Sequence, residues 1–296
     1  MSRVKASGIK MHADVLDRLE TMTLPQVLIH QAQAFGSDPP AIREKAYGIW
    51  QTYTWQDYLD YVRLTAYGLK ALGLKRHDNV AMVVNNHPEW LFCQLGSQAM
   101  GAVTLNLFTS AVASEIASTL KRVNARIVIV QDQEQTDKIL EQSSNLPHLE
   151  ALVYVDPTGM RGYAGNRLLV SYKDLLELGK KHELRHPGLF VEEVSKGKPS
   201  ETAHMILTSG TTGVSKLAML SHRNYTAMAR QWIETAPVTR GGNWLSMTPP
   251  AWIVDQMWAF GVALMGGMTM NFPETPETVT EDFREIGPEL LITSSR

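Results

Sequence analysis

Residues 203–222 have the sequence AHMILTSGTTGVSKLAMLSH, which carries the clearest structural signal of the chain. Residues 203–207 are a short apolar run, and residues 217–220 are a second one beyond a polar, glycine-containing segment. Short apolar runs bounded by turn residues are typical of strands. The sequence therefore predicts that residues 208–216 connect the two strands of a β-hairpin.

The predicted loop combines hydroxyl side chains with two glycines and one lysine. Glycines let the backbone approach an anion closely and let successive N–H groups turn toward it. Hydroxyls add donors, and a lysine adds a point charge for phosphate oxygens. By composition alone, the alternative is a surface turn rich in serine, threonine and glycine. The residues expected to bind a triphosphate are Thr208, Ser209, Gly210, Thr211, Thr212, Gly213 and Lys216.

This loop is not a Walker A motif, in which Gly-Lys-Ser/Thr run in direct succession into a helix. Lys216 stands three residues after Gly213, and a strand-like segment follows it. A helix is expected only from Ser221 or Asn224. We therefore expect the loop to close over phosphates from one side of a hairpin.

Upstream of the loop, residues 79–155 alternate between short apolar runs and helical patterns. Such alternation, with continuous apolar strands, is typical of a parallel sheet covered by helices. We therefore expect an α/β fold of mostly parallel sheets flanked by helices. The predicted strands are 79–85, 102–107, 126–131 and 151–155.

The segment before residue 79 also carries clear local signals. A helix is predicted over 24–35, and a hairpin is predicted within 41–53 around Gly48. Thr54 and Asp57 have the spacing of a capping box, so a long helix is predicted to begin there. Residues 1–23 are expected to be a loose leader.

The polar segment 186–202 is predicted to be a linker between two lobes. It would separate a first α/β lobe, residues 24–185, from the start of a second lobe, residues 203–296, that carries the phosphate loop and is incomplete. Within the second lobe, the apolar run 257–270 is shorter than the roughly 20 residues of a membrane span. Because two glycines interrupt it, we expect a buried helix followed by a turn and a strand.

Composition sets broad limits on the function. The apolar fraction of 44%, the charged fraction of 20% and the net charge of -2 are typical of a folded soluble protein and indicate no nucleic-acid partner. Cys93 is the single cysteine, which favours a reducing compartment, and its apolar neighbours predict a buried, inert thiol. The first residues lack the apolar segment of a signal peptide. We expect a cytoplasmic protein, with peripheral membrane contact left open.

Residues 207–222 resemble the ATP-phosphate motif of the adenylate-forming (AMP-binding) superfamily, which includes acyl-CoA synthetases, luciferases and the adenylation domains of peptide synthetases. The usual motif has Pro before the lysine and Gly after it, where this chain has Ser215 and Leu217. Residues 79–90 and 101–106 resemble the family's first core strands and helix. The resemblance covers nearly the whole chain.

A second resemblance lies in residues 249–256, PPAWIVDQ. The corresponding family motif places an aromatic residue or a histidine beside the carboxylate substrate, and Trp252 holds that position here. The motif looks most similar to that of long-chain acyl-CoA synthetases. A tryptophan of the hydrophobic core is the alternative for Trp252.

The resemblance implies a ligase that works in two steps. A carboxylic acid, expected to be a fatty acid, attacks the α-phosphorus of ATP and releases pyrophosphate. The thiol of coenzyme A then attacks the acyl-adenylate and releases AMP. In this scheme residues 208–213 cradle the β- and γ-phosphates, and Lys216 is the catalytic residue that neutralises the departing pyrophosphate. Magnesium shares that role, and no residue of the chain is assigned to it as a ligand.

The family's later motifs and its C-terminal lobe are missing from these 296 residues. We therefore expect the N-terminal portion of a longer enzyme, inactive by itself. Two alternatives stay open: an enzyme that adenylates an aryl or amino acid, and a non-catalytic nucleotide-binding fragment.

Overall fold

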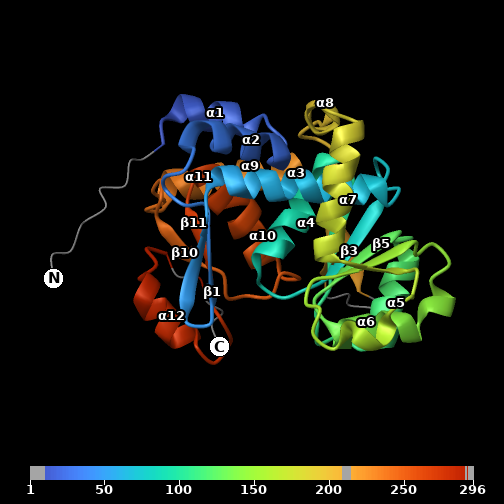
Figure 1. The fold of residues 1–296 in the computed structure, drawn as a ribbon. Helices are drawn as coiled ribbons and strands as arrows, with labels where there is room; N and C mark the ends of the chain where they lie inside the picture. Colours follow the sequence, from blue (N-terminus) through green and yellow to red (C-terminus); the bar gives the residue numbers. More distant parts are fainter. Residues whose placement is uncertain (1–10, 209–214, 291, 293–296) are drawn as a thin grey trace. The chain divides into compact units, whose positions relative to one another are not determined.

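The structure is a computed structural model that describes residues 11–208, 215–290 and 292. Two compact units make up the chain (Figure 1). Unit 1 comprises Met1–Leu59, His222–Thr248 and Val254–Arg296, and unit 2 comprises Asp60–Ser221 and Pro249–Ile253.

Unit 2 is built on a seven-stranded sheet with the order β7-β6-β5-β3-β4-β8-β9. Every neighbouring pair is parallel except β8 and β9, which are antiparallel. This arrangement confirms the predicted α/β class with mostly parallel strands. The strands are β3 (Asn79–Val83), β4 (Val103–Asn106), β5 (Ile127–Val130), β6 (Ala151–Tyr154), β7 (Leu169–Ser171), β8 (Thr202–Thr208) and β9 (Lys216–Ser221).

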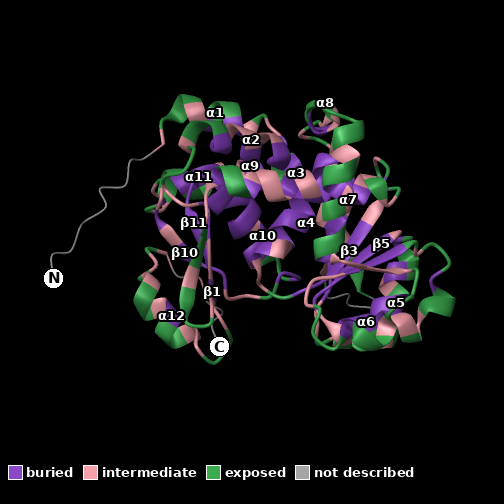
Figure 2. Cartoon of the chain, in the orientation of Figure 1, coloured by how far each residue is buried: buried purple, intermediate pink, exposed green. Residues whose placement is uncertain are grey.

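Helices cover both faces of this sheet, and the central strands β3 and β5 are buried (Figure 2). On one face, Ile116 and Leu120 of α5 and Ile139 of α6 pack with Val83 and Val128 in one apolar cluster. On the other face, α7 contacts β6 and β7. The helices that follow residue 60 are α4 (Pro88–Ala99), α5 (Ala113–Arg122), α6 (Gln133–Glu141), α7 (Tyr172–Arg185) and α8 (Leu189–Lys196), with short 3-10 turns at Ser143–Asn145 and Met160–Tyr163.

The long helix α3 (Trp55–Ala71) begins at the predicted capping box. The Thr54 N–H donates to the Asp57 carboxylate at 2.8 Å, and the Asp57 N–H donates to Thr54 Oγ1 at 3.0 Å. Farther along, α3 lies so close to α7 that a Cβ on Gly179 would sit 2.1 Å from the Leu64 carbonyl oxygen. The glycine therefore permits the close packing of the two helices.

Unit 1 contains a four-stranded sheet with the order β10-β11-β1-β2. Its strands are β1 (Ile42–Ala46), β2 (Ile49–Tyr53), β10 (Asn243–Leu245) and β11 (Thr269–Phe272). The β1–β2 pair is the predicted hairpin, whereas β11 lies parallel to both β1 and β10. In the described part of unit 1, three helices precede β10 in the sequence, and one follows β11. They are α1 (Ala13–Glu20), α2 (Leu24–Phe35) and α9 (His222–Thr235), and then α12 (Val279–Ile286).

The apolar run before β11 forms a helical stretch, as predicted. It consists of α10 (Ile253–Met257), a π-helical segment at Trp258–Ala263 and α11 (Leu264–Gly266). Gly267 then has a φ of 66°, which turns the chain into β11. In the part of the chain that the structure describes, no helix is both long and apolar enough to cross a membrane.

The compact units do not follow the contiguous lobes expected from the sequence. The expected linker contains α8, whose Phe190 and Val194 are buried. The expected leader contains α1, which is joined to α9 by an ion pair of 2.8 Å between Glu20 and Arg230. The first strands of the chain belong with its last ones because β1 pairs with β11. Pairing between strands so far apart in sequence leaves no local signal.

Candidate functional site

The candidate phosphate loop joins β8 to β9, the antiparallel pair at one edge of the unit 2 sheet. Thr208 faces Lys216 in the register of this pair, and the Thr208 hydroxyl donates to the Lys216 carbonyl at 3.4 Å. The predicted hairpin is therefore confirmed. Of the expected phosphate-binding residues, Ser209, Gly210, Thr211, Thr212 and Gly213 lie outside the described residues.

The two ends of the loop belong to a strand pair that contacts β4 and an apolar cluster. β8 lies parallel to β4, and Leu207 and Leu217 pack against the apolar cluster beneath α5. The side chain of Lys216 is exposed at the start of β9. An exposed ammonium group at this position is accessible to an anion.

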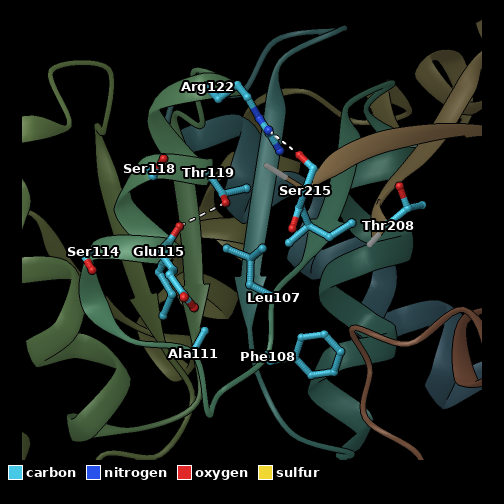
Figure 3. Close-up of a pocket in the computed structure, with 12 residues that line it drawn as sticks. Leu107, Phe108, Ala111, Ser114, Glu115, Ser118, Thr119, Arg122, Thr208 and Ser215 are labelled. Atoms are coloured by element: carbon cyan, nitrogen blue, oxygen red, sulfur yellow. Dashed lines mark hydrogen bonds between the residues drawn. The ribbon is translucent and has the colours of Figure 1, made fainter. Parts of the chain in front are cut away.

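A cavity of about 550 Å³ lies between the polar face of α5 and the ends of β8 and β9 that flank the loop (Figure 3). Its walls are polar on the helix side and apolar at the base. The lining residues are Leu107, Phe108, Ala111, Ser114, Glu115, Ile116, Ser118, Thr119, Arg122, Leu207, Thr208 and Ser215. Of the expected site residues that the structure describes, Thr208 lines this cavity, whereas Lys216 and Trp252 do not.

Arg122 lines this cavity and makes a contact that was not predicted from the sequence. Its Nη1 donates to the carbonyl oxygen of Ser215 at 2.7 Å, so the last residue of α5 holds the residue before Lys216 (Figure 3). A basic residue at a helix C-terminus is common for its favourable interaction with the helix dipole. Because that placement needs no other reason, the sequence carried no signal for this contact.

Trp252 is 42% exposed, which rules out a tryptophan of the hydrophobic core. The backbone N–H of Trp252 donates to the backbone carbonyl of Pro249 at 2.8 Å and so closes a tight turn. Trp252 is not among the residues that line the cavity beside the loop. Its exposed side chain is accessible to a ligand.

Asp255 organises the same segment and was missed at the sequence level. Its buried carboxylate accepts hydrogen bonds from the hydroxyls of Ser246 and Thr248, and from the Thr248 N–H at 3.3 Å. These bonds tie the end of β10 to the start of the following helix, and so close the base of the turn that carries Trp252. Asp255 lies within the stretch 249–256, but its spacing gave no hint of these partners.

Cys93 and His222 are both buried and have structural roles. Cys93 is fully buried, and burial, with a smaller effect of Glu89, raises the pKa of its thiol well above its usual value. The expected burial of this thiol is therefore confirmed. His222 opens α9, its Nδ1 accepts from the Leu24 N–H at 3.2 Å, and burial lowers its pKa to about 3.

Comparison with known proteins identifies the family to which the chain belongs. The sequence model of the family described as "AMP-binding enzyme" matches residues 28–296. That match covers both sheets and the loop between β8 and β9. The chain belongs to the AMP-binding enzyme family.

Relatives within the AMP-binding family include a protein of Xenopus laevis named "Long-chain-fatty-acid--CoA ligase ACSBG2". It is 31% identical over 227 residues, which are 74% of this chain and 29% of that protein. A Rattus norvegicus protein of the same name is 29% identical over 281 residues, which are 92% of this chain and 41% of the relative. The chain thus spans less than half the length of these curated relatives.

Two solved structures have a similar fold. The anthranilate CoA ligase AuaEII, in complex with anthranoyl-AMP, matches with a TM-score of 0.75 at 18% identity, over 90% of this chain and 49% of that one. The N-terminal domain of FACL13 from Mycobacterium tuberculosis matches with a TM-score of 0.72 at 18% identity, over 89% and 61% of the two chains. These similarities establish the fold of the chain.

Proposed function

We propose that this chain is the ATP-binding part of an enzyme that activates a carboxylic acid, first as an acyl-adenylate and then as a coenzyme A thioester. The proposed acid is a long-chain fatty acid. The observation that carries the proposal is the loop TSGTTGVSK between β8 and β9, with Lys216 at its exit, in a member of the AMP-binding enzyme family. The names of the curated relatives support the fatty acid as the substrate.

The chemistry needs what this loop offers. Adenylation brings a carboxylate to the α-phosphorus of ATP, so two negatively charged groups must approach each other. Its barrier falls when the phosphate charge is screened and the reactants are aligned. Thr208 and Lys216, at the two ends of the loop, offer a hydroxyl and an ammonium group on the same side of the strand pair. We assign residues 208–213 to the β- and γ-phosphates and Lys216 to the departing pyrophosphate.

Magnesium would accompany the nucleotide and screen its phosphate charge. Among the described residues that line the cavity beside the loop, Glu115 is the one carboxylate. Mg²⁺ prefers oxygen ligands and commonly binds through substrate phosphates with one or two carboxylates. The donor set here therefore fits a magnesium ion held largely by the phosphates of the nucleotide.

Trp252 is proposed to contact the carboxylic acid. It is exposed on a turn whose base is held by Asp255, so its indole ring is presented from a fixed segment. An apolar aromatic surface suits an aliphatic chain better than a polar acid. We expect the acid to bind with its apolar part against Trp252.

The first test is a calorimetric titration of the 296-residue chain with MgATP. Lys216→Ala should raise the dissociation constant of MgATP at least tenfold, about 1.4 kcal/mol, because it removes a positive charge that faces the phosphates. Lys173→Ala, which removes an exposed lysine on α7, is the matched control and should bind as the unmodified chain does. Equal affinity of Lys216→Ala and the control would remove Lys216 from the site.

The second test addresses the acid. ATP–pyrophosphate exchange, measured on the full-length protein with aliphatic, aryl and amino acids, reports which acid is adenylated. Exchange with long-chain aliphatic acids supports the proposal. Exchange only with aryl or amino acids would overturn the fatty acid, and MgATP binding without exchange for any acid would favour a non-catalytic nucleotide-binding role.

A further inference from the structure

The exit of the phosphate loop is held by a helix that the motif does not include. Arg122, the last residue of α5, donates from Nη1 to the Ser215 carbonyl oxygen at 2.7 Å (Figure 3). Ser215 immediately precedes Lys216, the lysine of the loop. A hydrogen bond from a charged donor is stronger than one between neutral groups. The contact therefore joins a guanidinium group to the peptide that presents the lysine.

The geometry of the peptide bond turns this contact into an orientation. The peptide between Ser215 and Lys216 is planar and trans, so its C=O and N–H point in opposite directions. Arg122 draws the C=O toward α5, and this directs the Lys216 N–H away from α5. On the other side, the Thr208 hydroxyl donates to the Lys216 carbonyl at 3.4 Å. Residues 215 and 216 are thus held from the helix and from β8.

The anchor for this contact is rigid. Ile116, Ala117 and Leu120 of α5 are buried in the apolar cluster of unit 2, with exposed fractions of 1%, 6% and 1%. Close-packed cores allow little movement of the elements that form them. Arg122 follows Leu120 by two residues, so its backbone is tied to that core. The exposed residue Ser215 is thereby connected to an element packed in the apolar cluster.

We propose that Arg122 is a positioning residue for the phosphate loop, which sets the orientation of the Ser215–Lys216 peptide so that Lys216 faces the phosphates of a bound nucleoside triphosphate. The inference rests on the proposed ATP-binding function of the loop. Arg122 acts through Ser215 and Lys216, so no contact between Arg122 and the nucleotide is required.

Amide hydrogen exchange tests the contact without any ligand. In the 296-residue chain, Arg122→Ala should speed exchange of the amides of residues 216–218 by about tenfold, because it removes a charge-assisted bond from an exposed segment. Arg122→Lys keeps one cationic donor and should restore part of the protection. Lys121→Ala removes a charge from the adjacent, exposed position of α5 and should leave these amides unchanged. Amides of α5 near Leu120 report whether each variant keeps its fold.

A MgATP titration of the same variants separates positioning from folding. Arg122→Ala should raise the dissociation constant by roughly 3- to 10-fold, Arg122→Lys should recover part of it, and Lys121→Ala should match the unmodified chain. Unchanged exchange at residues 216–218 in Arg122→Ala would overturn the positioning role, whatever the chain binds. Faster exchange in a chain that never binds MgATP would retain the contact and overturn the proposed function instead.

Discussion

At the scale of single residues, buried polar groups help to hold together the strands next to the candidate phosphate loop. His204 lies in β8, four residues before Thr208, and is fully buried. Its Nδ1 lies 2.9 Å from the Thr104 hydroxyl, which also donates to the Ala203 carbonyl at 3.1 Å. Burial lowers the pKa of His204 to about 3, so the ring is neutral at pH 7. The histidine therefore joins β8 to β4 without a charge.

The lowered histidine pKa values predict acid sensitivity. The pKa values of His204 and His222 fall from about 6.5 in the unfolded chain to about 3 in the folded one. Between these values the unfolded chain binds more protons, so the free energy of unfolding decreases as pH falls below about 6.5. Each histidine contributes a slope of up to about 1.4 kcal/mol per pH unit. Urea denaturation at pH 7, 6 and 5 measures it.

A variant isolates the share of one histidine. His204→Asn should show a shallower decrease of stability between pH 7 and pH 5 than the unmodified chain, because one titrating group is gone. His148→Asn, at an exposed position, is the matched control. If His204→Asn and the unmodified chain show the same dependence on pH, His204 does not cause the acid sensitivity.

At the scale of helices and strands, local signals predicted elements well and contacts between them poorly. Helix α2 occupies the predicted residues 24–35, and its capping box between Thr23 and Gln26 is fully formed. The hairpin β1–β2 also follows from local turn residues. The packing of α3 on α7 does not, because it depends on Gly68 and Gly179 meeting across more than 100 residues of sequence.

The α3–α7 contact gives a prediction with an internal control. Gly179→Ala places a Cβ 2.1 Å from the Leu64 carbonyl oxygen, so the helices must separate. The overpacking should exceed the usual gain from alanine in a helix and lower the free energy of unfolding by about 1–3 kcal/mol. Gly162→Ala meets nothing within 4 Å and should be close to neutral. Thermal or urea denaturation compares the two, and equal stability would show that the close approach is relaxed in solution.

At the scale of the whole molecule, residues from opposite ends of the sequence meet inside unit 1. Lys45 of β1 donates to Asp282 of α12 at 2.8 Å and to Glu285 at 2.7 Å. The hydrogen bonds to these carboxylates raise the pKa of Lys45. Burial opposes ionisation of Asp282, but hydrogen bonds from Lys45, Thr278 and the Glu274 N–H outweigh it and lower its pKa. This network attaches the last described helix to the first hairpin.

Removing one charge of this network should loosen unit 1. Asp282→Asn deprives the buried Lys45 of its most buried partner, so it should lower the thermal midpoint. Glu281→Gln, on the exposed position beside it, should have little effect. A group with a lowered carboxyl pKa stabilises above its unfolded value and loses that contribution as pH falls through its folded value. The gap between Asp282→Asn and the unmodified chain should therefore shrink below about pH 4, and a gap that persists there would argue against the ion pair as its cause.

Local sequence signals were enough to predict the α/β class, most helices and strands of the chain, and the hairpin formed by β8 and β9. These features depend on apolar periodicity, caps and glycines, which act over a few neighbouring residues. It also predicted the loop residues 208–213 and Lys216 from their order, and assignment of their roles stays a prediction. Trp252 was left between a core position and a substrate position.

The way in which segments distant in sequence pack together could not be predicted from local signals and is visible in the folded chain. Three contacts join positions that carry no sequence signature: β1 with β11, Asp255 with Thr248, and Arg122 with Ser215. The exposure of Trp252 likewise had no signature in the sequence. The physical reason is that the same residue types serve many partners: an arginine at the end of a helix looks alike whether it meets solvent or a loop carbonyl. The loop proposed to bind phosphate has a recognisable order of residues in the sequence, whereas the contact from α5 to Ser215 is visible only in the folded chain.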